Sequence, residues 1–176
     1  MSLGKNSDGS MFKNSGLLGY LVKSLKQKYP DRQIGKTVIQ KMMYLLSRNG
    51  IMDFEFSMYH YGPYSSEVAG ELNFAERSGI VEISWVDEKG YYIKPTNKVE
   101  EFSSLLDDEE KHLVDSLVER FGSFKAIDLS LIATALYLKD NFGVEDDRLV
   151  DAVHNAKKKY SPEYIDGVLK AGGIRI

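Results

Sequence analysis

The chain of 176 residues is 43% hydrophobic, carries a formal net charge of −3 and contains no cysteine. This hydrophobic content suffices for one domain with a buried core, and the lack of cysteine excludes a disulfide framework, a thiolate metal site and a cysteine nucleophile. We recognise no apolar run long enough to cross a bilayer and no secretory signal, so no membrane contact and a cytoplasmic location are expected.

Lysine and arginine are concentrated near the start of the chain. Residues 1–48 hold nine of them against two aspartates, whereas residues 49–176 hold fourteen against twenty-four aspartates and glutamates. This asymmetry indicates either two faces with different partners or self-association between unlike faces into a homo-oligomer. Two separately solvated helical surfaces are the simpler alternative.

Residues 1–10 are polar and rich in glycine and serine, which predicts a disordered or vector-derived tail. Apolar residues at helical spacing predict one helix over 14–28, capped by Asn14 or Ser15, and a second over about 35–48. The motif Gly35-Lys36-Thr37 lacks the earlier glycine and the preceding strand of a phosphate loop, so we interpret it as a helix start.

An alternating, strand-like run over residues 53–61 is followed by Gly62-Pro63, a pair that predicts a tight turn. Ser65 or Ser66 can then cap a helix over 66–77. Four aromatic rings are crowded at this joint between strand and helix: Tyr59, His60, Tyr61 and Tyr64.

Residues 80–86 and 91–94 alternate around Asp87-Glu88-Lys89-Gly90, which is a hairpin signal. The predicted order of helix, helix, strand, helix and hairpin is that of a winged helix. Helices alone are expected after residue 104, with starts near Asp107, Ala126, Glu145 and Ser161.

The predicted fold is therefore mainly α (α+β). A winged-helix-like unit with a small antiparallel sheet is expected over residues 11–100. It is expected to pack on a C-terminal helical bundle over 104–176, so that the two units form one compact domain.

Two segments resemble a known family. The segment Thr37-Val-Ile-Gln-Lys-Met-Met-Tyr-Leu-Leu46 is similar to the "LQKLLY" helix of Panacea-domain proteins, the SocA-like and YwgA-like group. The segment Phe56-Ser-Met-Tyr-His-Tyr-Gly-Pro-Tyr-Ser65 resembles that family's aromatic strand, which ends in Tyr-Gly-Pro. The resemblance covers about residues 14–173. It implies a non-enzymatic regulatory or interaction module, because some members act as antitoxins or present a partner protein; the longer C-terminal helical part departs from the antitoxin type.

A module that binds a protein partner is the favoured function. Tyrosine suits interfaces because it covers a large area at little cost in rotamer entropy and keeps a polar tip. Two alternatives stay open: the rings fill the core between strand and helices, and Gln40 bonds the strand backbone. The predicted partner-binding residues are Tyr59, Tyr61, Pro63, Tyr64, Lys36, Gln40 and Lys41.

The alternative function is a nucleic-acid-binding transcriptional regulator. The helix 66–77 would be the recognition helix, but this helix and the tip of the following hairpin are acidic and would repel a duplex. The basic helices 14–28 and 35–48 are then the expected contact surface, through Lys23, Lys26, Lys28, Arg32, Lys36 and Lys41.

An enzyme is not expected. The histidines His60, His112 and His154 fall on different predicted elements without metal-binding spacing, so neither a metal nor a cofactor is expected. His60 is the single candidate for a general base, and the acidic run at 107–110 is interpreted as a helix start.

Overall fold

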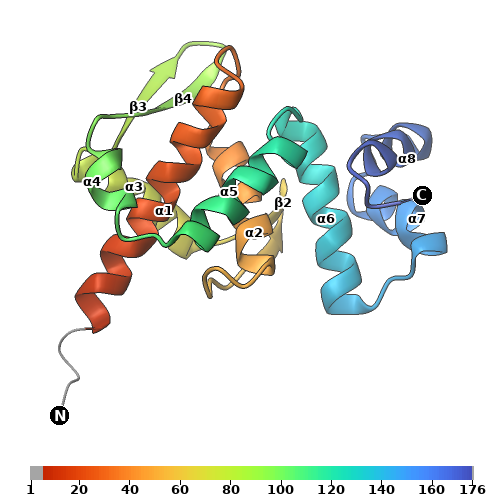
Figure 1. Cartoon of the computed structure of the whole chain (residues 1–176). Coiled ribbons are helices and arrows are strands. Elements are labelled where there is room, and N and C mark those ends of the chain that lie inside the picture. Colours follow the sequence, from red (N-terminus) through yellow and green to blue (C-terminus); the bar gives the residue numbers. More distant parts are fainter. Residues whose placement is uncertain (1–5, 176) are drawn as a thin grey trace.

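The computed structural model describes residues 6–175, and within them it shows a mainly helical protein with two small antiparallel hairpins (Figure 1). The predicted fold class is thereby confirmed. The elements are α1 (Asn6–Lys28), α2 (Lys36–Arg48), β1 (Ser57–Tyr59), β2 (Gly62–Tyr64), α3 (Ser66–Arg77), β3 (Val81–Val86), β4 (Gly90–Pro95), α4 (Val99–Ser103), α5 (Asp108–Phe121), α6 (Ala126–Phe142), α7 (Asp146–Ala156) and α8 (Pro162–Ala171).

The helices α2 and α6 form the centre of the core. Every residue of α2 from Val38 to Leu46 is buried, as is every residue of α6 from Leu129 to Leu136. The two helices pack on each other and on β2. One hydrophobic cluster, from Leu17 to Leu169, therefore includes residues of both predicted units.

The first helix begins earlier than predicted. The backbone is helical from Asn6, so residues 6–10 of the expected tail belong to α1, while residues 1–5 lie outside the described part of the chain. Ser15, one of the two predicted caps, lies inside the helix and donates a hydrogen bond to Oε2 of Glu71 on α3. Residues that favour helix caps are also tolerated inside a helix when a neighbouring element offers a partner.

The tight turn lies two residues before its predicted position, Gly62-Pro63. Tyr59 pairs with Gly62 and Ser57 with Tyr64, so His60 and Tyr61 form a two-residue hairpin loop. Gly62 and Pro63 therefore lie in the returning strand β2 and not in the turn. A proline is tolerated there because β2 has a single neighbouring strand.

The second hairpin and the later helices follow the sequence prediction. Val86 of β3 pairs with Gly90 of β4, and the two hairpins form separate sheets in place of the single small sheet expected. Ser65 caps α3 by accepting a hydrogen bond from the Val68 N–H. A capping box begins α5, and Ser161 followed by a proline begins α8.

Within residues 6–175, no single helix has both the length and the apolar content needed to cross a bilayer. The helices α5 and α6 meet these two criteria only when taken together, and they are bent by 113° at their junction.

Candidate functional site

Three hollows meet around the β1–β2 hairpin, and both Thr37 and Tyr61 line all three. The small hollow, of about 250 Å³, lies between α2, the hairpin and α3. The large hollow, of about 800 Å³, lies between the α1–α2 connection and the β3–β4 hairpin. The third hollow, of about 450 Å³, lies between the hairpin loop, α6 and the α7–α8 connection. We call their combined lining the hairpin-tip surface.

The tyrosines of the hairpin are exposed on this surface. Tyr59 is 61% exposed, Tyr61 68% and Tyr64 38%. The Tyr59 ring lies 5.6 Å from the Tyr64 ring and 4.6 Å from the ring of His60, measured between centroids. The alternative that these rings fill the core is therefore wrong.

The opposite side of the hairpin is fixed to α2 by two buried polar side chains. The Gln40 amide donates to the Ser65 carbonyl at 2.9 Å and accepts from the Ser65 N–H at 3.0 Å. The Lys41 Nζ donates to the Pro63 carbonyl at 2.8 Å. Gln40, Lys41 and Pro63 were predicted to contact a partner, but all three are buried, and Gln40 has the backbone-bonding role that was its alternative.

The hairpin approaches α6 so closely that only glycine fits at position 62. Gly62 has a φ of +96°, and a Cβ built on it would lie 2.7 Å from Oγ1 of Thr134 and 3.2 Å from the Ser130 carbonyl oxygen. The Thr134 hydroxyl is buried and has no hydrogen-bond partner among the described residues. The strand β2 is therefore held between α2 and α6.

Lys41 is a buried cation without a carboxylate partner among residues 6–175. Its side chain is 2% exposed, and its nitrogen is bonded to a backbone carbonyl. Burial, together with a smaller contribution from repulsion by Lys157, lowers the pKa of Lys41 to about 8. Lysine is rarely buried without a counter-ion, because the charged form loses its hydration.

The described residues that line the three hollows include many cations and no aspartate or glutamate. Several of the cations are held by carbonyl groups or rings: Arg32 donates to the Gly122 and Phe124 carbonyls, Lys157 donates to the His60 carbonyl, and Lys36 lies 4.0 Å from the centre of the Tyr91 ring. Such partners leave the positive charge uncompensated. The eight lining cations are Arg32, Lys36, Lys41, Lys89, Lys125, Lys157, Lys158 and Lys159.

The lysines of α1 that were predicted to contact nucleic acid lie elsewhere. Lys23 forms an ion pair with Glu100 of α4. Lys28 lines a separate hollow together with Asp115 and Glu119 of α5. Lys26 is half-buried in the last turn of α1. Carboxylates of α4 and α5 thus accompany Lys23 and Lys28, and of the predicted set only Arg32, Lys36 and Lys41 line the hairpin-tip surface.

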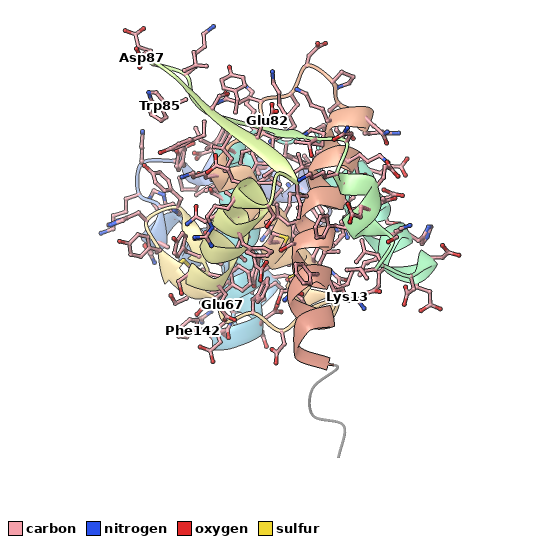
Figure 2. All side chains as sticks on the ribbon, turned by 90° about the vertical axis from the view of Figure 1, so that its left-hand side faces the viewer. Lys13, Glu67, Glu82, Trp85, Asp87 and Phe142 are labelled. Atoms are coloured by element: carbon pink, nitrogen blue, oxygen red, sulfur yellow. The ribbon has the colours of Figure 1, made fainter. Side chains whose placement is uncertain are left out.

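Sequence reasoning missed the part of this surface that comes from distant segments. Lys157–Lys159 is a visible basic run in the sequence, but nothing in the sequence places it beside residue 61. Trp85, 59% exposed, packs edge-on against the Tyr91 ring and donates from its indole nitrogen to Asp87. Figure 2 shows Trp85 and Asp87 near the outer end of the β3–β4 hairpin.

The histidines lie on separate elements, but His60 lies in the hairpin loop and not in the strand predicted over residues 53–61. His60 is exposed in the hairpin loop, His112 is exposed on α5, and a ring nitrogen of His154 lies 2.8 Å from the Tyr160 carbonyl oxygen. Within the described part of the chain, no group of three histidines, aspartates or glutamates is arranged to hold a metal ion.

No family model matches the chain, and no curated protein matches it. A functional assignment therefore depends on the geometry of the hairpin-tip surface.

Proposed function

We propose that the protein is a non-enzymatic regulatory or adaptor module that binds an acidic segment of a partner protein at the hairpin-tip surface. The observation that carries this proposal is the position of the exposed Tyr61, at the junction of three hollows whose described lining is cationic and free of carboxylates. Exposed aromatic residues beside pockets are typical of binding hot spots, and the uncompensated charge selects an acidic partner.

The form of the surface favours a protein over a nucleic acid. The cations line three adjoining hollows of about 250, 450 and 800 Å³, whereas nucleic acid is bound along a continuous basic groove. Arg32, Lys41 and Lys157 are bonded to backbone carbonyls, which restricts their movement towards phosphates. The neighbouring α3 helix and the tip of the second hairpin carry acidic residues, among them Glu67 and Asp87, which would repel a duplex.

The resemblance of residues 37–46 and 56–65 to Panacea-domain proteins supports the same proposal, since it implies an interaction module. In this proposal the two resembling segments form a single structural unit: Gln40 and Lys41 of the first segment hold Ser65 and Pro63 of the second. An antitoxin-like role and a cytoplasmic location belong to the proposal as well.

A pull-down from native lysate, run with and without nuclease, tests the proposal. We expect a protein to be recovered in stoichiometric amount with and without nuclease. The variant Tyr61→Ala should bind this protein at least about tenfold more weakly and so fail to recover it. Phe142→Ala is the matched control, because Phe142 is 69% exposed and lies on α6 outside the three hollows.

Three outcomes contradict the proposal. Unchanged recovery with both Tyr61→Ala and Lys36→Glu would remove the hairpin-tip surface as the binding site. Material that disappears with nuclease and returns only at low salt would instead identify a nucleic-acid-binding protein. Recovery of the chain alone, with a sedimentation mass that is a multiple of the monomer, would identify self-association.

A further inference from the structure

The small hollow combines an apolar wall with a buried positive charge. Ile39, Val68 and Leu72 line it beside the rings of Tyr59 and Tyr64, and Lys41 belongs to the same lining. A volume of about 250 Å³ is below the range of about 300–1,000 Å³ typical of drug-sized ligands. The occupant that fits is therefore a single amino-acid residue or an acid of similar size.

The charge of Lys41 is uncompensated from every side that the structure describes. The charged or titratable groups that line the small hollow with it are Lys36 on α2 and the hydroxyls of the three hairpin tyrosines. Lys157 acts on it from the α7–α8 connection and is a cation. The helix α6 presents the uncharged Ser130 and Thr134 behind Gly62.

We propose that the small hollow binds a monocarboxylate with an apolar or aromatic body, and that Lys41 is its counter-ion. The carboxylate supplies the negative charge that the surroundings of Lys41 lack, and attraction between opposite charges is strongest where water is excluded. The apolar body covers the tyrosine rings and the aliphatic wall. This ligand site does not depend on the proposed protein partner, since a free acid and the last residue of a polypeptide present the same chemistry.

The test uses the full chain and two probes that differ only in charge. We expect N-acetyl-L-phenylalanine to bind, by calorimetry or by backbone amide shifts of the hairpin, at least about tenfold more tightly than N-acetyl-L-phenylalanine amide. Equal binding of acid and amide, or no binding of the acid up to about 10 mM, overturns the proposal.

Two variants separate Lys41 from general attraction by the cationic surface. Lys41→Met keeps the length of the side chain and removes the charge, so the acid should lose at least about tenfold in affinity while the amide is unaffected. Lys36→Met, which removes the other lysine of the small hollow, should cost the acid less. Equal losses in the two variants would exclude Lys41 as the counter-ion.

The pH dependence of the wild-type protein gives a readout that needs no variant. Affinity for the acid should decrease between about pH 7 and about pH 9.5, as Lys41 loses its proton, whereas affinity for the amide should stay constant. An affinity for the acid that is flat over this range contradicts the proposal. This measurement decides the matter even if Lys41→Met does not fold.

A further arm distinguishes the source of the ligand. A tetrapeptide that ends in phenylalanine with a free carboxylate is compared with N-acetyl-L-phenylalanine. Tighter binding of the tetrapeptide indicates the C-terminus of a polypeptide, and equal binding indicates a small free acid; both support the site. A protein partner that binds normally to Lys41→Met would leave the proposed function intact while this ligand site is tested on its own.

Discussion

The cations of α1 and the cations of the hairpin-tip surface have different partners. On α1, Lys13 and Lys23 form ion pairs with Glu110 and Glu100. On the hairpin-tip surface, Lys41 and Lys157 donate to backbone carbonyls. A carbonyl satisfies the hydrogen bond but leaves the net charge, whereas a carboxylate removes it. Of two regions that are both rich in lysine, only the second is therefore suited to attract an anion.

The two regions also differ in how much their contacts contribute to the stability of the fold. The α1 pairs are at least partly exposed, and exposed pairs contribute little to stability. The β1–β2 hairpin, in contrast, is held in place by buried polar groups and by a close backbone contact. Disrupting either should lower the free energy of unfolding more than loss of an exposed ion pair. The following predictions test this contrast, from the largest expected effect to the smallest.

Gly62→Ala should give the largest loss of stability, about 3–4 kcal/mol in the free energy of unfolding. The added Cβ combines a left-handed backbone with a clash against Thr134. Gly50→Ala is the control, because Gly50 also has a positive φ, +83°, but nothing lies within 4 Å of the added Cβ. We expect about 1 kcal/mol there. Urea denaturation of both variants makes the measurement, and equal losses would show that β2 is not held tightly against α6.

Lys41 should make the protein more stable as the pH rises above neutrality. The pKa of Lys41 is about 8 in the folded state and ordinarily 10.5. Between these values the unfolded chain binds more protons than the folded protein, so raising the pH removes protons mainly from the unfolded chain and destabilises it relative to the folded state. The free energy of unfolding should increase by up to about 3 kcal/mol between about pH 8 and about pH 10.5.

The corresponding control is Lys41→Met, which should lack this increase while sharing the titration of all other groups. The difference between the two proteins in urea denaturation isolates Lys41. Parallel profiles over the whole range would mean that the Lys41 ammonium is hydrated in the folded protein.

Gln40→Leu should cost about 2 kcal/mol, because the N–H and the carbonyl of Ser65 lose their buried partner. Gln33→Leu is matched to it: Gln33 also bonds backbone carbonyls, those of Lys89 and Tyr91, but in an exposed position where water can replace it. We expect less than about 0.5 kcal/mol for Gln33→Leu in thermal or urea unfolding. A larger loss for Gln33→Leu than for Gln40→Leu would show that the buried hydrogen bonds of Gln40 do not hold the hairpin on α2.

Lys23→Ala should have the smallest effect, within about 0.5 kcal/mol of the wild-type free energy of unfolding, because its ion pair with Glu100 is exposed. It should also leave partner binding and its salt dependence unchanged, whereas Lys36→Ala should weaken both. Affinities measured at low and moderate salt compare the two variants. A stronger effect of Lys23→Ala on binding would move the site to α1.

Local sequence patterns were sufficient for most of the helices and for the second hairpin. The caps at Ser65, Asp107 and Ser161 are short-range hydrogen bonds between residues three positions apart, so the sequence specifies them directly. The start of α1 was wrong because the partner of Ser15 is Glu71, which only packing brings near. The turn was misplaced because Gly62 and Pro63 are also compatible with a strand that has one neighbour.

The candidate site was predicted only in part, and the reason is physical. By itself the sequence determined the fold class, the aromatic stretch at 59–64 and the backbone-bonding alternative for Gln40. Only the tertiary structure decided which side of that stretch is exposed, because alternation along a strand does not specify which face is packed. It also decided which lysines keep an uncompensated charge: Lys23 meets Glu100, whereas Lys157 reaches the carbonyl of His60, 97 positions away in the chain. Charge compensation depends on distances in space, and the linear sequence shows neither that Lys23 lies beside Glu100 nor that Lys157 lies beside the His60 carbonyl.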